Sequence, residues 1–244
     1  MNIGINCFNI NANYGGGINT FTLGLLEGFA SVGKEHQFKI FVKESNKRLF
    51  EPFKKYDNFE IIVLKDVNRL KFLIRGLALT TRSKFIYHKI CNMLYNSITK
   101  EQDKHSDVIY SSTTFMFPYN FKKPTVVSTH DIQQLHFPQF FSKFELLNRK
   151  IHHELSAELV TYIQASSRFI KKDIVEHFKF VPEEKVVFIP QGVNIDKFNV
   201  DVDTSYLSDK YGIPDEFLLY PAQLWPHKNH LTILKALKIL KEEH

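Results

Sequence analysis

Residues 2–32 read NIGINCFNINANYGGGINTFTLGLLEGFASV, and they decide the fold of the chain. An apolar run is followed by a polar turn with three consecutive glycines, and then by a segment whose apolar residues recur at helical spacing. A strand, a glycine-rich turn and a helix in this order are typical of a parallel sheet with helical connections.

The same alternation continues along the chain. Short β-branched or aromatic runs recur between longer helical patterns, and the runs are apolar through their length. Strands buried on both faces have this composition, because helices cover each side of a parallel sheet. The sequence therefore predicts a doubly wound α/β domain that reaches about Pro190. The predicted strands are NIGINCF, FKIFVK, FEIIVL, DVIYSS, TVVSTH, LVTYIQAS and KVVFIP, and the predicted helical segments are 18–32, 46–55, 69–97, 142–156 and 167–178.

A polar connector over residues 191–216 contains few core-forming residues and several turn formers. Beyond it the alternation restarts, with FLLYPAQ predicted as a strand and residues 229–244 as a helix. One strand and one helix cannot bury a two-faced parallel strand. These residues are therefore interpreted as the opening unit of a second domain whose remainder is missing from the chain.

This interpretation divides the chain into three parts. We expect a complete N-terminal domain over 1–195, a linker over 196–214 and the incomplete start of a second domain over 215–244. In a truncated unit the apolar face of the last helix lacks its partners. We therefore expect it to be exposed or loosely packed at Ile233, Leu237 and Leu240.

Composition excludes several protein classes. The 244 residues contain no uncharged apolar run long enough to span a membrane, and the N-terminus lacks the pattern of a secretory signal, which predicts a cytoplasmic protein. Cys7 and Cys91 lie too far apart for a zinc or redox motif, so buried thiols are expected. The net charge of +6 suggests an anionic partner. The phenylalanines are spread through the strands rather than set among basic residues, which argues against nucleic acid as that partner.

The glycine-rich turn has three interpretations. Backbone N–H groups at the start of a helix favour a phosphate, so a diphosphate suits this place. A dinucleotide would require a third glycine where the sequence has Thr20, although Glu44 after the second strand could bind a ribose hydroxyl. A loop without a ligand is the third possibility, because short glycine motifs often occur without function.

A second segment, YPAQLWPHKNH at residues 220–230, has the same arrangement. It follows a predicted strand and begins a helix, with Asn229 available as the N-cap. Lys228 lies at the positive end of this helix, which is unfavourable unless an anion is shared between its ammonium group and the backbone N–H groups. A solvated surface lysine is the alternative.

Four motifs in order resemble the retaining glycosyltransferase family 4, which has the GT-B fold of two Rossmann-like domains. They are GGGINTF near the start, VVSTHDIQQLHFP in the middle, ASSRFIKKDIVEHFKFVPEEKVVFIPQGVN at the end of the first domain and YPAQLWPHKNH in the second. The LWPHKN form is similar to mannosyltransferase-like members that build bacterial surface polysaccharides such as lipopolysaccharide.

The resemblance implies roles for five residues. Gly16 and Gly17 match glycines whose amides approach the donor diphosphate, and His130 matches the histidine that contacts the donor sugar near the reacting centre. Lys228 matches the basic residue that neutralises the leaving diphosphate. Many members have an arginine five residues before that lysine, but this chain has Gln223, so Lys228 would carry more of the charge. A core histidine is the alternative for His130.

The resemblance also implies a function for the whole protein: transfer of a sugar, possibly mannose, from a GDP- or UDP-linked donor to a saccharide or lipid-linked acceptor. The family's E-x7-E pair lies late in the second domain, and the chain ends before that place, so we expect this chain to be an inactive fragment. The QGVN turn at 191–194 resembles the family's N-G-V-D turn and is interpreted as a hinge. A non-catalytic membrane- or partner-binding module and an NAD-binding oxidoreductase remain the alternatives.

Residues 69–97 suggest a membrane face. If they form one helix, Leu70, Leu73, Ile74 and Leu77 lie on one side, and the basic residues lie on another. Such a stripe could rest on anionic lipid at the inner face of the cell membrane, or it could simply be solvated. The basic residues of this face are Lys71, Arg75, Arg82 and Lys89.

A metal site is not expected. His130, His136, His152 and His153 have a spacing that fits no zinc template, and H-E-x-x-H is absent. The resemblance likewise implies no metal and no cofactor, since the nucleotide sugar is a substrate.

Overall fold

The computed structural model describes residues 1–13, 16–65, 68–195, 203–214 and 216–243. These residues belong to two compact units, Met1–Val193 and Asn194–His244. Gly15 of the glycine turn and residues 196–202 of the predicted linker lie outside the described residues.

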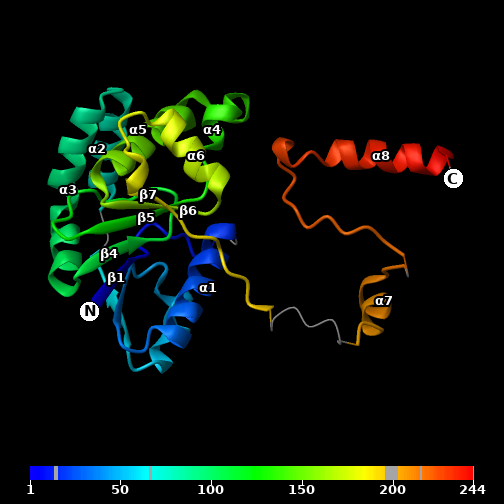
Figure 1. The fold of residues 1–244 in the computed structure, drawn as a ribbon, viewed down its shortest axis with the longest axis horizontal. Coiled ribbons are helices and arrows are strands. Elements are labelled where there is room, and N and C mark those ends of the chain that lie inside the picture. The colour runs from blue at the N-terminus through cyan, green and yellow to red at the C-terminus, as the bar shows by residue number, and fades with distance from the viewer. Residues whose placement is uncertain (14–15, 66–67, 196–202, 215, 244) are drawn as a thin grey trace. The chain divides into compact units, whose positions relative to one another are not determined.

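The first unit is built on a seven-stranded sheet in the order β3-β2-β1-β4-β5-β6-β7, and every neighbouring pair is parallel (Figure 1). This confirms the predicted doubly wound α/β fold, and all seven predicted strands are present. The strands are β1 (Asn2–Asn6), β2 (Gln37–Val42), β3 (Phe59–Val63), β4 (Val108–Ser111), β5 (Thr125–Thr129), β6 (Tyr162–Ala165) and β7 (Val186–Phe188).

Helices connect these strands, and four of them begin at a side-chain cap. Asn68, Ser83, Ser142 and Ser167 each accept a hydrogen bond from a backbone N–H three residues later. The α-helices of this unit are α1 (Gly17–Val32), α2 (Arg69–Thr80), α3 (Lys84–His105), α4 (Gln133–His136), α5 (Lys143–Leu159) and α6 (Arg168–His177), and the 3₁₀ helices are η1 (Lys47–Leu49), η2 (Glu51–Lys55), η3 (Pro138–Phe140) and η4 (Glu183–Lys185).

Two hydrophobic cores lie on opposite faces of the sheet. Phe38 and Ile40 of β2 pack with Leu26 of α1 in one core, whereas Phe41 belongs to the other core with residues of α3, α5 and α6. Neighbouring residues of a strand point to opposite faces, so β2 serves both cores. In Figure 1, α1 lies below the sheet and α5 and α6 lie above it.

The strand order reverses its direction between β1 and β4. From β1 the chain moves outward to β2 and β3, and after α3 it returns to β4 on the other side of β1. In open α/β sheets ligands bind at such a switch point, outside the carboxyl ends of the strands. The segments after β1, β4 and β5 meet at this place.

The predicted helix over 46–55 is wrong, because this segment forms the short 3₁₀ helices η1 and η2. Phe50 and Phe53, three residues apart, are both buried. A 3₁₀ turn aligns residues at this spacing, and Pro52 near its start removes a backbone donor.

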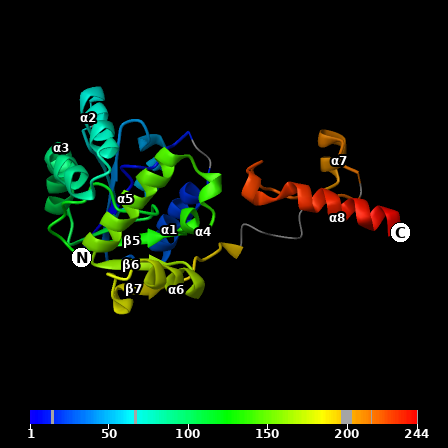
Figure 2. The ribbon, with the colours of Figure 1, turned by 90° about the horizontal axis from the view of Figure 1, so that it is seen from above.

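The continuous helix expected over 69–97 is also wrong. It is interrupted between α2 and α3, where Arg82 adopts a left-handed conformation with φ 57° and Ser83 caps the next helix. Figure 2 shows α2 and α3 side by side at the edge of the first unit. The basic residues of the predicted stripe therefore lie on two helices and the turn between them.

The second unit contains helices but no strand among its described residues. The prediction for FLLYPAQ is wrong: residues 217–223 make only local turns, because no neighbouring strand supplies ladder hydrogen bonds. Leu237 and Leu240 are exposed and Ile233 is half-buried, as expected for a helix without a packing partner. Its helices are α7 (Tyr206–Tyr211), the 3₁₀ helix η6 (Pro226–Lys228) and α8 (His230–Glu243).

Candidate active site

The start of α1 lies at the switch point of the sheet. Gly16 is the N-cap residue, and its carbonyl oxygen accepts the first helical hydrogen bonds from the backbone N–H groups of Asn19 at 3.0 Å and Thr20 at 3.3 Å. Gly16 makes no side-chain cap hydrogen bond, and the first turn of α1 contains no acidic residue. The early N–H groups of a helix have no intrahelical acceptor, so this start offers donors to an anion.

Gly17 faces open space. A Cβ atom built on Gly17 would meet no atom within 4 Å. By contrast, a Cβ on Gly4 in β1 would come within 2.3 Å of the Ser106 hydroxyl oxygen, so packing explains that glycine. Packing does not require the glycine at position 17. A ligand that approaches the backbone closely would require a glycine at this position.

His130 follows β5 directly, and both of its ring nitrogens are hydrogen-bonded. Its Nε2 lies 2.8 Å from the carbonyl oxygen of Ser112, which follows β4. Because a carbonyl oxygen only accepts, Nε2 carries the proton. In the neutral ring Nδ1 is then the acceptor, and it receives a hydrogen bond from the Gln191 side-chain amide at 3.1 Å.

The side chain of His130 also contacts α1. The Phe21 ring meets the imidazole edge-on, with centroids 4.8 Å apart. Phe21 lies four residues after Gly17 on the same face of α1, so His130 lies about one helical turn from the glycine. The hydroxyl groups of Thr22 and Ser112 are 2.7 Å apart and join α1 to the end of β4. The fold thus brings the predicted glycines and His130 together.

Gln191 contacts the candidate residue His130, and the sequence motifs do not indicate this contact. It was interpreted as part of a hinge, yet its side chain holds His130 from a segment beyond β7. The available signal was its position, because Gln191 follows the last predicted strand and must lie at the same sheet edge as His130.

Lys228 and Gln223 belong to the second unit. Both are exposed. The Tyr220 hydroxyl donates to the backbone carbonyl of Lys228 at 2.8 Å, and the Trp225 indole N–H donates to the Gln223 side-chain oxygen. Lys228 ends η6 two residues before α8 begins, and Asn229 adopts a left-handed conformation between them.

The structure changes the predicted membrane face. Arg82 and Lys89 are exposed, but Lys71 donates to the Leu94 carbonyl oxygen, and Arg75 lies over the Phe72 and Phe117 rings. Of the four apolar residues expected on the other side, Ile74 is half-buried, and the exposed ones are Leu70 by 63%, Leu73 by 61% and Leu77 by 69%.

Two of the remaining histidines are core residues. The His152 ring is hydrogen-bonded to two tyrosines. Its Nε2 lies 3.0 Å from the Tyr87 hydroxyl, and its Nδ1 is bonded to the Tyr119 hydroxyl. Burial and the nearby Arg75 lower the pKa of His152 to about 3, and burial with the nearby Arg149 lowers the pKa of His153 to about 4. Both rings are therefore neutral at physiological pH.

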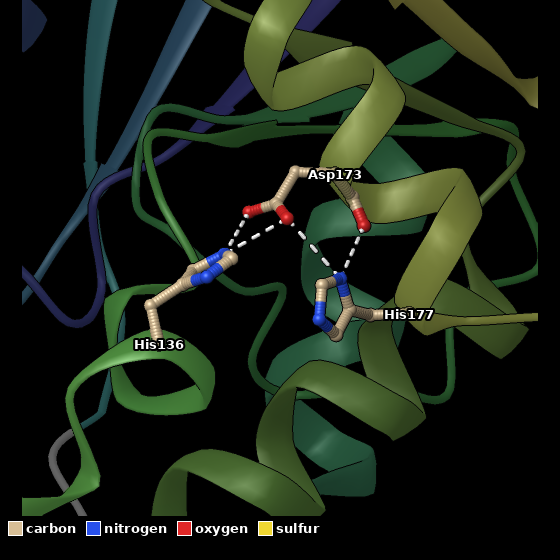
Figure 3. Close-up of side chains that lie close together, drawn as sticks. All are labelled: His136, Asp173 and His177. Atoms are coloured by element: carbon tan, nitrogen blue, oxygen red, sulfur yellow. Dashed lines mark hydrogen bonds and ion pairs between the residues drawn. The ribbon is translucent and has the colours of Figure 1, made fainter.

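His136 belongs to a different cluster. Figure 3 shows its imidazole and that of His177 on either side of the Asp173 carboxylate. His136 Nε2 lies 2.8 Å from both carboxylate oxygens, and His177 Nδ1 lies 3.1 Å from Oδ1. This group contains the residue types of a metal site. The spacing among the histidines 130, 136, 152 and 153 does not reveal it, because its other two members are Asp173 and His177.

Residues 15–197, well over half of the chain, match the profile of glycosyltransferase family 4. The chain belongs to glycosyltransferase family 4. This membership agrees with the resemblance found in the sequence motifs. No curated protein sequence matches the chain significantly.

Solved structures share the fold of this family 4 chain. A glycosyltransferase from Rickettsia africae ESF-5 matches 99% of the chain with a TM-score of 0.56 and 18% identity. Alr3699/HepE of Anabaena, solved in complex with UDP and glucose, matches 96% with a TM-score of 0.55 and 18% identity. The chain spans 57% of the length of each of these proteins. At such identities the likeness establishes the fold.

None of the helices in the described part of the chain has the length and apolar character needed to cross a membrane.

Proposed function

We propose that the whole protein is a retaining glycosyltransferase that moves a sugar from a nucleoside diphosphate donor to a saccharide or lipid-linked acceptor in bacterial surface polysaccharide synthesis. The observation that carries this proposal is that His130 lies beside the start of α1, where Gly16 provides no side-chain cap. Both lie at the switch point of a family 4 domain. Ligands of open α/β sheets bind at this place.

The chemistry needs an anion site beside a polar group. Breaking the bond between sugar and phosphate builds positive charge on the anomeric carbon and negative charge on the departing diphosphate. Fixed donors on the phosphate side lower this barrier. The backbone N–H groups at Gly16 and Gly17 supply such donors. Because Gly17 has no side chain, the space beside its backbone is open to a ligand.

His130 is suited to bind the donor sugar as a neutral ring. Nε2–H is held by the Ser112 carbonyl oxygen, which leaves Nδ1 as the acceptor. A sugar hydroxyl group can donate to Nδ1 in place of the Gln191 amide. The exchange replaces one hydrogen bond by another, so it leaves no buried polar atom without a partner.

Two residues of the second unit also have roles in the proposed reaction. The Lys228 ammonium group neutralises the leaving diphosphate, and Gln223 donates a neutral hydrogen bond. Both GDP and UDP remain candidate nucleotides, and mannose is the candidate sugar from the LWPHKN motif. The presence of UDP and glucose in the Anabaena fold neighbour supports a nucleotide donor of this class.

Contact with a membrane surface is the second part of the proposal. Residues 68–100 contain no acidic residue, while α2 and α3 expose apolar side chains that include Phe85 and Met93. Apolar side chains surrounded by basic ones favour an anionic bilayer, where a lipid-linked acceptor would be found. The basic residues of this stretch are Arg69, Lys71, Arg75, Arg82, Lys84, Lys89 and Lys100.

A non-catalytic membrane-binding module is the second candidate function, and it rests on the same surface. Flotation with phosphatidylglycerol vesicles should recover the chain, and Leu73→Ser with Leu77→Ser should reduce the recovery. Phe144→Ser is the matched control, since Phe144 is an exposed apolar residue of α5. Equal recovery of all three proteins would contradict the membrane surface.

The experiment that tests the catalytic proposal is a transfer assay. The whole protein is incubated with UDP- and GDP-linked hexoses and a lipid-linked saccharide, and the anomeric configuration of the product is read by NMR. We expect transfer from one donor with retention of configuration. A product with inverted configuration would refute the retaining mechanism, and binding to vesicles without any transfer would favour the non-catalytic module.

A further inference from the structure

We propose that His136, Asp173 and His177 form a binding site for one zinc-class divalent cation. The three ligand atoms come from α4 and α6 and lie within 4.8 Å of one another (Figure 3). This site is independent of the glycosyltransferase proposal, because none of the three residues contacts His130 or the start of α1 in the interactions described above.

The residue types and their spacing fit such a cation. Two imidazoles and one carboxylate are the protein ligands of many zinc sites that keep a fourth position open. Asp173 and His177 are four residues apart on α6, so they lie on one face of the helix, as the two ligands of a helical metal motif do. His136 approaches the same carboxylate from α4.

The distances require only small movements. Zinc–nitrogen and zinc–oxygen bonds of about 2.1 Å place neighbouring tetrahedral ligands about 3.4 Å apart. His136 Nε2 lies 2.8 Å from the carboxylate oxygens and His177 Nδ1 lies 3.1 Å from Oδ1. Cation binding would widen the two contacts with the carboxylate by about 0.3–0.6 Å, and the two imidazole nitrogens, which lie within 4.8 Å of each other, would take a similar spacing.

Charge favours a cation at this place. The side chain of Asp173 is 5% exposed, and its ion-pair partners are the two histidines. Within the described ranges no lysine or arginine pairs with this carboxylate, since Lys171 pairs with Glu183 and Lys172 with Glu176. A buried carboxylate needs a compensating charge, and a divalent ion supplies it more fully than neutral imidazoles do.

Protons must leave the ligand atoms when the cation binds. His136 Nε2–H donates a hydrogen bond to the Asp173 carboxylate, and His177 Nδ1–H donates one to the backbone carbonyl of Asp173 at 2.9 Å. In the bound state a ligating nitrogen has no proton, so each neutral ring carries its proton on the other nitrogen. Imidazole nitrogen suits zinc better than magnesium, which prefers oxygen ligands.

The site is accessible from solvent. His136 and His177 are 35% and 36% exposed at their side chains. His177 also lines a cavity of about 400 Å³, together with Gln134, Lys150 and Glu154. The partial exposure of both imidazoles lets a water molecule reach the ligand atoms as the fourth ligand.

Zinc titration of the tag-free chain tests the proposal. Chelator-treated protein is titrated with ZnCl₂ in a calorimeter, and Co²⁺ is added separately to follow its visible absorption. We expect the calorimeter to record one bound equivalent of Zn²⁺ per chain and no saturable binding of Mg²⁺. The visible absorption of Co²⁺ should indicate a coordination of lower symmetry than that of the hydrated ion. His136→Gln and His177→Gln should each abolish the saturable step, and Zn²⁺ should raise the Tm of the unmodified chain but not of these two variants.

His105→Gln is the matched control. His105 pairs with Glu101 at i, i+4 on α3, 3.0 Å apart, but it is not part of the three-ligand group. This variant should bind Zn²⁺ like the unmodified chain, and circular dichroism establishes that all variants are folded. Absence of a stoichiometric step in the unmodified chain, or binding by folded His136→Gln equal to that of the unmodified chain, would overturn the proposal.

Discussion

The starts of α1 and α8 were predicted from the same pattern, and they differ in the structure. Each follows an apolar run and a polar turn, and each was expected to face a phosphate. The start of α1 follows β1, which pairs with β2 and β4, and it lies beside His130. The start of α8 follows residues 217–223, which pair with no strand among the described residues.

The difference teaches what a strand–turn–helix pattern requires. A parallel strand needs neighbours for its hydrogen bonds and helices for both of its faces. In the first unit these partners exist, so the turn after β1 is fixed against the sheet edge. In the second unit local contacts, such as that of Tyr220 with the Lys228 carbonyl, hold the turn.

The largest expected effect concerns the start of α1. In the whole protein, His130→Ala should lower kcat/KM for transfer by about 10²–10³-fold, the usual cost of removing one polar group at a reacting centre. His105→Ala, far along α3, should leave the rate unchanged. Rates are measured with labelled donor at several donor concentrations. A His130→Ala protein as active as the unmodified one would make this histidine a core residue.

The second expected effect tests the start of α8. Lys228→Ala should lower kcat/KM by about 10²-fold, because the leaving diphosphate loses its cation. The control is Lys235→Ala, an exposed lysine of α8. If Lys228→Ala behaves like the control, the first unit binds the diphosphate without help from this lysine.

The third effect concerns the core on the other face of the sheet, around His152 of α5. The pKa of His152 is lowered from 6.5 to about 3 in the folded protein, so the unfolded chain binds the proton first as the pH falls. Stability is therefore full above pH 6.5 and decreases toward pH 3, and His152 alone should cost on the order of 2 kcal/mol at pH 5.

Urea denaturation at pH 7.5 and pH 5 measures this loss. Near-ultraviolet circular dichroism reports on the aromatic core around His152. His152→Gln should flatten the pH dependence, even if it lowers stability at both values. An unfolding midpoint that does not move between the two pH values would contradict the neutral buried ring.

The smallest effect separates binding from folding at Gly17. Gly17→Ala meets no atom within 4 Å, so it should leave stability equal or higher by up to about 1 kcal/mol. Its methyl group should weaken donor binding about tenfold, measured by calorimetry with UDP or GDP. Gly24→Ala, which also meets open space in the interior of α1, should raise stability in the same way but leave donor binding unchanged. Equal binding by both variants would place the diphosphate elsewhere.

The sequence predicts the sheet well because its strands are apolar on both faces. The start of α1 and the position of His130 after β5 follow from that pattern and the family motifs. Contacts between distant segments could not be predicted. Gln191 reaches His130 only because β7 and β5 end at one sheet edge, and Asp173 meets His136 across 37 residues of sequence.

The errors have local physical causes. The break between α2 and α3 contains neither glycine nor proline. Arg82 adopts a left-handed conformation there, which an arginine does not predict. Ser83 was the readable signal, since it caps α3. In the segment 46–55, Pro52 was the signal against a regular helix. FLLYPAQ has the composition of a strand but no partner among the described residues.

The central claim is that the start of α1 contacts the donor diphosphate. A crystal structure of the whole protein with a nucleoside diphosphate sugar tests this claim most directly. The account predicts a phosphate oxygen within hydrogen-bond distance of the backbone nitrogen of Gly16 or Gly17, about 2.9 Å, with the sugar beside His130. A diphosphate bound without contact to α1 would contradict it.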